Sequence, residues 1–342
     1  MTIPLHRIAA TASVVATLLS AAWASAEEPA APTAVNADPA CTVSATMMPG
    51  NPAALLDLCR DRAEAGDLQA QYALGLAHYV GVGAPQDYGE AARWYRMAAD
   101  QDYVEAQVRL GAMYLTGRGV ERDFVAAARW YERAAEQGDV EAQNAIAGLY
   151  LTGTGVAQDF LKAARWYRLA AEQGDAEAQY FIGALYYDGH GVERDYGEAW
   201  KWFRLAADQG DLDAHFMLGR IYAEGGGVEV SMPDAVAWYG LAAEQGHARA
   251  QAALGALLLR GAPGVQKNLI DAYKWLSLAV EQDIEEARAL RDEAAAAIEE
   301  DKSQKAWPPS KSGGSAWWIT AASGGRASEH RQQPWRRAGP HC

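Results

Sequence analysis

The chain has 342 residues, half of which are hydrophobic, with 30 basic and 44 acidic side chains. This composition is that of a folded protein, with enough apolar material for one large or two ordinary cores. Residues 27–300 carry a net charge of −20, because residues 1–26 contribute +1 and residues 301–342 contribute +5 to the total of −14. Phosphate backbones and anionic lipid would repel such a body, so nucleic acid and membrane surfaces are poor partners, and basic or neutral partners remain.

Residues 1–26 have the layout of a secretory signal peptide. Arg7 precedes an apolar run over residues 8–23, and the small residues Ala24 to Ala26 stand before Glu27. The apolar run is shorter than the roughly 20 residues that a membrane-spanning helix needs. We therefore expect an exported protein, periplasmic or secreted, whose soluble mature chain begins at Glu27 and has no transmembrane segment.

The sequence contains three cysteines, Cys41, Cys59 and Cys342. Cys41 lies in a leader, residues 27–50, that is expected to be flexible. In an oxidising compartment Cys41 and Cys59 could form a disulfide that ties this leader to the first helix. The sequence leaves open whether the two are bonded.

A period of 36 residues runs through the middle of the chain. One glycine marks the same place of the repeat at Gly75, Gly111, Gly183, Gly219 and Gly255, with Ala147 at the remaining place. A tryptophan recurs in step at Trp94, Trp130, Trp166, Trp202, Trp238 and Trp275. The last step is one residue longer because residues 261–265 carry an extra residue. Such a period indicates a solenoid, in which each unit buries its apolar face against its neighbours.

Each unit is predicted to consist of two helices. In the third unit, residues 138–153 and 159–173 both place apolar side chains at helical spacing on one stripe. Glycines such as Gly153, Gly155 and Gly174 can adopt the positive φ that ends a helix. The second helix of each unit begins after a residue whose side-chain oxygen can cap the first turn: Asp87, Asp123, Asp159, Asp195, Ser231 and Asn268.

The repeated pattern A-x-x-x-LG-x-x-Y-x-x-G-x-GV-x-x-D-x-x-x-A-x-x-W-Y-x-x-A-A-E-Q-G resembles the SEL-one-like repeat, a relative of the tetratricopeptide repeat, over residues 66–282. The resemblance implies an all-α fold, a right-handed α/α superhelical solenoid of six 36-residue helical hairpins. Residues 51–65 resemble a lone second helix that caps the N-terminal end, and residues 283–300 form a polar closing helix. His78, Leu258 and Leu276 depart from the pattern, which affects local packing and not the fold.

Residues 301–342 do not follow the repeat. Glycine, serine and proline are frequent there, tryptophans are scattered without a period, and the charge is basic. We expect this tail to be disordered. It either binds a partner or is a frame-shifted read-through without function.

The residues that usually carry chemistry are not arranged as in known sites. The GxG loops have neither the strand and third glycine of a dinucleotide site nor a following GK[ST], so they are expected to be structural. His78, His190, His215 and His247 stand at unrelated places, and no HExxH motif or paired-cysteine spacing of a zinc site occurs. No serine stands in a nucleophile elbow. We expect no catalytic residue, no metal and no cofactor.

Some cysteine-rich members of the family are penicillin-binding or weakly β-lactam-hydrolysing, and they carry a cysteine pair in every repeat. This chain has no cysteine between Cys59 and Cys342. The resemblance to that branch fails at its defining residues. A β-lactam-binding or hydrolysing enzyme is nevertheless the alternative function.

The first helix of each unit carries variable positions at spacings of three and four, which share one face. In such solenoids the stacked first helices usually line a concave groove, and Tyr, Phe, Met and Arg dominate protein contacts. The candidates for a partner-binding groove are Tyr72, Tyr79, Arg109, Asn144, Tyr180, Phe181, Tyr187, Phe216 and Arg220. Further candidates on the same positions are Leu76, Val108, Leu115, Leu151, Met217, Ala252 and Leu258. The alternative is that half of these side chains form the core between units.

The resemblance implies a non-catalytic scaffold or adaptor that binds a peptide or protein, as other adaptors of the family do in signalling, quality control and envelope assembly. Periplasmic regulators of exopolysaccharide production or secretion are among the resembling proteins. With the expected export, this favours a partner protein in the cell envelope.

Overall fold

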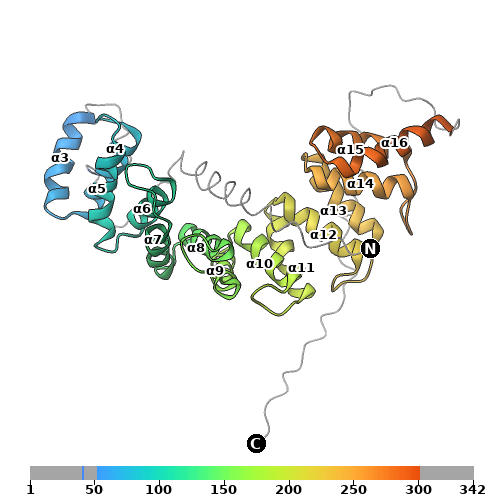
Figure 1. Cartoon of the computed structure of the whole chain (residues 1–342), viewed down its shortest axis with the longest axis horizontal. Coiled ribbons are helices and arrows are strands. Elements are labelled where there is room, and N and C mark those ends of the chain that lie inside the picture. Colours follow the sequence, from blue (N-terminus) through green and yellow to red (C-terminus); the bar gives the residue numbers. More distant parts are fainter. Residues whose placement is uncertain (1–40, 42–51, 301–342) are drawn as a thin grey trace, which may run out of the picture. The chain divides into compact units, whose positions relative to one another are not determined.

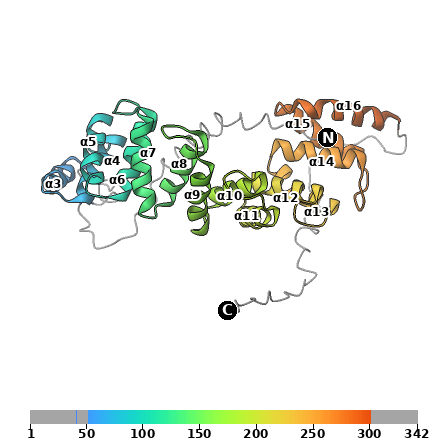
Figure 2. The same ribbon diagram turned by 60° about the horizontal axis from the view of Figure 1, so that its bottom comes forward.

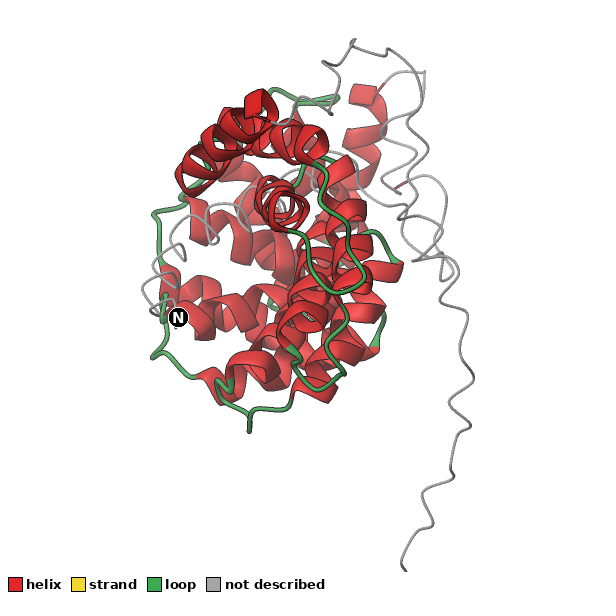
Figure 3. Ribbon diagram, turned by 90° about the vertical axis from the view of Figure 1, so that its right-hand side faces the viewer, coloured by secondary structure: helices red, strands yellow, loops and turns green. Residues whose placement is uncertain are grey.

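The computed structural model describes Cys41 and residues 52–300, and within them it holds fourteen helices and no strand (Figures 1 and 3). The helices of the first part are α3 (Pro52–Glu64), α4 (Leu68–Val80), α5 (Tyr88–Ala99), α6 (Val104–Thr116), α7 (Phe124–Glu136), α8 (Val140–Thr152), α9 (Phe160–Glu172) and α10 (Ala176–Asp188). Those of the second part are α11 (Tyr196–Asp208), α12 (Leu212–Glu224), α13 (Met232–Glu244), α14 (Ala248–Arg260), α15 (Leu269–Glu281) and α16 (Glu285–Glu300). The expected signal peptide, the leader apart from Cys41, and the tail lie outside the described residues.

The chain divides into two compact units, one ending at Arg194 and one beginning at Asp195. In the N-terminal unit each helix from α3 to α10 packs against the next one along the chain (Figure 2). The C-terminal unit repeats this order from α11 to α16, and α16 also touches α14. The all-α prediction of consecutive helical hairpins is therefore confirmed.

The predicted caps of the second helices are confirmed at all six positions. Asp123, for example, has an extended backbone, and its Oδ1 accepts hydrogen bonds from the N–H groups of Val125 and Ala126 at 2.9 and 3.0 Å. These bonds satisfy N–H groups that have no partner inside the helix. The sequence thereby fixes where each second helix begins.

The glycines end the helices as expected. Gly153 has a φ of 73° and closes α8, and Gly174 has a φ of 96° after α9. Gly155 has a second function, because a Cβ atom there would lie 2.1 Å from the carbonyl oxygen of Phe124. The loop of one repeat thus rests directly on the start of the second helix of the preceding repeat.

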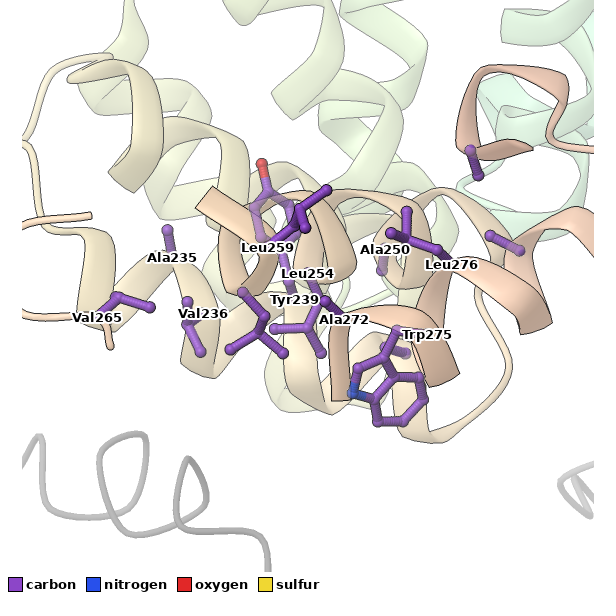
Figure 4. Close-up of a cluster of buried hydrophobic side chains, with 14 of the residues drawn as sticks. Ala235, Val236, Tyr239, Ala250, Leu254, Leu259, Val265, Ala272, Trp275 and Leu276 are labelled. Carbon is purple, nitrogen blue, oxygen red and sulfur yellow. The ribbon is translucent and has the colours of Figure 1, made fainter. Parts of the chain in front are cut away.

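Aromatic side chains of the second helices fill the core between helices. In the C-terminal unit Tyr239, Leu254 and Trp275 belong to one buried cluster (Figure 4). The ring of Tyr239 lies so close to Gly219 that a Cβ atom there would come within 2.5 Å of it. The repeated glycine of the first helix is therefore explained by the ring that packs across it.

Buried glutamines link successive repeats. Gln143 is 3% exposed, and its Nε2 donates to the carbonyl oxygen of Ala135 at 3.2 Å. Its Oε1 accepts a hydrogen bond from Nε2 of Gln173 at 2.9 Å. Because a buried amide without partners is costly, these bonds explain why glutamine recurs at this place.

Cys41 and Cys59 form a disulfide with a Cα–Cα distance of 5.6 Å. Both residues are buried together with Leu56, Leu74 and Trp94. The bond therefore joins Cys41 to the core beneath α3.

Loss of this disulfide should lower the free energy of unfolding by about 2–3 kcal/mol, because an 18-residue separation constrains the unfolded chain. Denaturant titration of the oxidised and reduced protein would measure the difference, and intact mass after thiol alkylation would report the state of the bond. Two freely alkylated thiols at Cys41 and Cys59, in protein from an oxidising compartment, would contradict the pairing.

Candidate functional site

In the N-terminal unit, side chains on the first helices α4, α6, α8 and α10 and on the residues that flank them contact one another from repeat to repeat. We call the surface that these side chains form the first-helix face. The contacts include Nη1 of Arg118 with the hydroxyl of Tyr79 at 3.2 Å and Nδ2 of Asn144 with Oδ1 of Asp175 at 2.9 Å. Such contacts place the variable positions of successive repeats beside one another.

Tyr72 does not belong to the exposed part of this face. Its side chain is 9% exposed, and its ring lies 5.5 Å from the rings of both Tyr95 and Tyr103. These neighbours enclose it from the second helix of its own repeat and from the start of the next. Tyr72 is therefore a core residue, contrary to its prediction as an exposed groove residue.

Tyr79 is half-buried and takes part in an aromatic and basic cluster. Its ring meets that of Tyr88 edge-on at 5.1 Å, and its hydroxyl accepts the hydrogen bond from Arg118. Burial raises the pKa of Tyr79, and the positive charge of Arg118 acts in the opposite direction. The hydroxyl is therefore protonated near neutral pH and can also donate.

Arg109 lies half-buried in the middle of the first-helix face. Its Nη1 is 4.0 Å from Oε1 of Glu141, an ion pair longer than a hydrogen bond. Burial raises the pKa of Glu141, which Arg109 opposes, and burial also raises the pKa of the neighbouring Asp139. The face thus holds the half-buried cation of Arg109 near the exposed carboxylate of Glu141 and the half-buried carboxylate of Asp139.

Asn144, Tyr180 and Phe181 are half-buried and lie around the start of α10. The Phe181 ring stacks on the buried Tyr167 ring at 4.9 Å, and Tyr180 meets Phe181 edge-on at 5.3 Å. Asn144 is joined to this group through Asp175, the N-cap of α10. Tyr187, near the end of the same helix, is also half-buried.

In the C-terminal unit, Phe216 and Arg220 lie on α12 and are half-buried. The Phe216 ring stacks on His247 at 5.1 Å and lies 5.6 Å from the ring of Tyr239. Nε of Arg220 is 3.4 Å from Oε1 of Glu224, one turn further along the helix. The guanidinium of Arg220 therefore already contacts a carboxylate of its own chain.

Several of the further candidates are core residues instead. Those with less than one tenth of their surface exposed are Val108, Leu115, Met217 and Leu258. Leu258 packs in the cluster that also contains Trp275 and Leu276 of α15. Leu76, Leu151 and Ala252 remain half-buried.

The sequence interpretation did not include Tyr167, Asp175 and Arg118, which the structure brings to this face. Tyr167 lies within residues 159–173, whose apolar stripe predicts the core. Asp175 stands before the first helix of its repeat, where the same place holds Asp67, Asp139 and Asp211. The recurrence of aspartate before the first helix of several repeats predicts a polar group at the edge of the first-helix face.

Two features are absent from the described part of the chain. None of its helices combines the length and the apolar character needed to cross a bilayer. No group of three or more His, Cys, Asp or Glu side chains in residues 52–300 is placed to hold a metal ion.

The model of the Sel1 repeat family matches residues 68–103, 104–139, 140–175, 176–211, 212–247 and 248–290. A Sel1 repeat protein from Oxalobacter formigenes is 31% identical, with a TM-score of 0.59 over 71% of this chain and 97% of its own. A protective antigen of uropathogenic Escherichia coli with an SLR fold is 28% identical, with a TM-score of 0.56 over 87% of this chain and 68% of its own. No curated protein matches the chain.

Proposed function

The chain belongs to the Sel1 repeat family, and from this membership we propose that it is a non-catalytic scaffold that binds a peptide or protein partner on its first-helix face. Sel1 repeat proteins are typically protein-interaction scaffolds. A scaffold needs a surface that differs between members of the family while the fold is kept. The first helices provide such a surface, because their repeated positions form the core and their variable positions are left for contact with a partner.

The observation that carries this proposal is the composition of the half-buried positions. Tyr79, Arg109, Tyr180 and Phe181 are of the types that are enriched in the centres of protein interfaces. Their rings and charges are held by neighbours from adjacent repeats, so little side-chain freedom would be lost on binding. This favours recognition of a partner by a surface that is already in place.

We place the scaffold in the cell envelope, as a periplasmic or secreted protein. The support is the signal-like layout of residues 1–26 together with the disulfide between Cys41 and Cys59. Disulfides persist in oxidising compartments and are rare in the cytosol. Cleavage before Glu27, measured as the mass of the mature protein, tests the location.

The combined variant Tyr180→Ala and Phe181→Ala should weaken partner capture roughly 30-fold or more, because truncating one hot spot costs at least about 2 kcal/mol. The melting temperature should stay within a few degrees, since both side chains are only half-buried. The measurement is the amount of each envelope protein that immobilised wild-type and variant protein retain.

Tyr186→Ala is the matched control, because Tyr186 lies on the same helix as Tyr180 but hydrogen-bonds to Arg168 of α9. Normal capture by the double variant, or its unfolding, would count against the proposed surface. Turnover of a chromogenic β-lactam by the purified protein would instead favour the enzymatic alternative.

A further inference from the structure

We propose that a pocket between α6 and α7 is a second binding site of the chain, and that it takes a partner segment in which an aspartate or glutamate stands next to an apolar residue. The pocket has a volume of about 710 Å³, and its lining includes Arg96, Tyr114, Glu121, Arg122, Phe124 and Val125. We call it the α6–α7 pocket. None of the predicted groove residues lines it, so this site goes beyond the proposed scaffold surface.

The α6–α7 pocket is open to solvent. The side chains of Arg96, Glu121 and Arg122 are exposed. Phe124 and Val125 are also exposed, by 38% and 48%, which is unusual for large apolar residues of this chain. A partner segment can therefore reach the two arginines and the two apolar side chains from solvent.

The two guanidinium groups have no carboxylate partner within the part of the chain that the structure describes. Nη2 of Arg96 donates a hydrogen bond to the hydroxyl of Tyr114. The guanidinium of Arg122 lies 5.4 Å from the centre of the Phe124 ring. Because a guanidinium carries five N–H donors in a planar fork, most donors of both groups remain for a ligand.

The third repeat shows how the same place is completed elsewhere in the chain. Tyr150 holds the place of Tyr114, and its hydroxyl donates to Oε1 of Glu132 at 3.0 Å. Nζ of Lys162 lies 3.4 Å from this hydroxyl and 4.7 Å from the centre of the Tyr150 ring. The third repeat thus brings an acid and a base of its own chain to the tyrosine.

In the second repeat only one of these two charges is present. Arg96 holds the place of Glu132 with the opposite sign, and Ala126 holds the place of Lys162. The group that would complete the arrangement around Tyr114 is therefore a carboxylate. The α6–α7 pocket lies at Arg96 and Tyr114, where a carboxylate from outside can take that place.

The two acidic side chains of the pocket do not fill this role. Oδ1 of Asp123 accepts the hydrogen bonds that begin α7, from the N–H groups of Val125 and Ala126. Glu121 is exposed and forms no ion pair with either arginine of the pocket. The charges of Asp123 and Glu121 favour a ligand group with a single negative charge over a phosphate, whose charge is close to two.

The exposed apolar side chains define the rest of the ligand. Phe124 and Val125 follow Arg122 and Asp123 directly in the chain, so a ligand that meets the arginines can cover them with a neighbouring apolar residue. Arginine and aromatic side chains are enriched at the centres of protein interfaces, and clustered arginines recognise acidic motifs. The occupant is thus a segment of a partner protein with an acid beside an apolar residue.

The net charge of −20 over residues 27–300 acts on such a segment mainly at long range. At physiological ionic strength, exposed charges more than about 8 Å apart are largely screened from each other. The two guanidinium groups would touch the bound carboxylate directly. Their charge-assisted hydrogen bonds therefore decide the binding at close range.

The test selects random linear peptides in parallel on the immobilised full-length chain and on its combined variant Arg96→Gln and Arg122→Gln. Peptides retained only by the unchanged chain should share an aspartate or glutamate next to an apolar residue. Replacing that acid by its amide in the synthetic peptide should weaken binding about tenfold or more, because hydrogen bonds between charged groups are lost. The same replacement should cost little when binding to the variant is measured, since the acid and the arginines act on each other.

Arg168→Gln is the matched control, because Arg168 holds the place of Arg96 on α9 and hydrogen-bonds to Tyr186 in the same way. Ala126→Glu supplies a carboxylate within the chain and should block the peptides. It should not lower the melting temperature, since glutamate is a good helix former. The melting temperature of the arginine variant should also be kept, because both side chains are exposed.

Selected peptides that lack an acid, or that bind the arginine variant as well as the unchanged chain, would overturn this inference. Equal weakening by Arg168→Gln would overturn it too. The variant Tyr180→Ala and Phe181→Ala should bind the acidic peptides normally, because neither residue lines the α6–α7 pocket. Failure of this site and failure of the first-helix face can therefore be told apart.

Discussion

Gly155→Ala is expected to lower the free energy of unfolding by about 3 kcal/mol or more. Gly155 has a φ of 71°, a backbone conformation that costs a residue with a side chain about 1–2 kcal/mol. In addition, the new Cβ would lie 2.1 Å from the carbonyl oxygen of Phe124 and 2.4 Å from its carbonyl carbon. Such overlap with backbone cannot be relieved by a rotamer change, so the loop must move away from the preceding repeat.

Gly174→Ala is the matched control. Gly174 also has a positive φ, 96°, but a Cβ atom there would meet no heavy atom within 4 Å. It should cost only the strain of the backbone, about 1–2 kcal/mol. Denaturant titration of both variants measures the difference, and equal losses would show that the contact between the Gly155 loop and Phe124 contributes nothing.

The features that the sequence predicted correctly are those that recur in every repeat. The six caps and the helix-ending glycines depend on a few neighbouring residues, so their signals can be read locally. Repetition strengthens the prediction, because Asp123 and Asp159 stand 36 residues apart at the same place of the repeat and each caps a second helix. The all-α fold and the helical hairpins followed from these signals.

The sequence was less informative about which variable side chains are exposed. Tyr72 and Tyr180 hold the same place in their repeats, yet Tyr72 is buried and Tyr180 is half-buried. The difference comes from their neighbours, since Tyr103 covers Tyr72 from the start of the next repeat. Position within one helix cannot reveal this, because the covering residue belongs to another repeat.

Trp166→Ala is expected to lower the free energy of unfolding by about 3–5 kcal/mol, a large share of a typical total of about 5–15. Trp166 lies on α9 and is 8% exposed, so its removal takes a large apolar surface out of the core and leaves a cavity. The third repeat has neighbours on both sides within the N-terminal unit. Because each repeat is stabilised through its neighbours, loss of packing at this position weakens contacts in both directions.

Leu161→Ala is the control for this prediction, because Leu161 lies on the same helix and is 67% exposed. Its truncation should change the free energy of unfolding by no more than about 0.5 kcal/mol, as expected for a surface position. Denaturant titrations of the two variants should therefore give clearly separated midpoints with similar slopes. Coincident midpoints would mean that the tryptophan period does not mark the core. A smaller slope for Trp166→Ala would instead show that the repeats on either side of α9 unfold separately once this contact is lost.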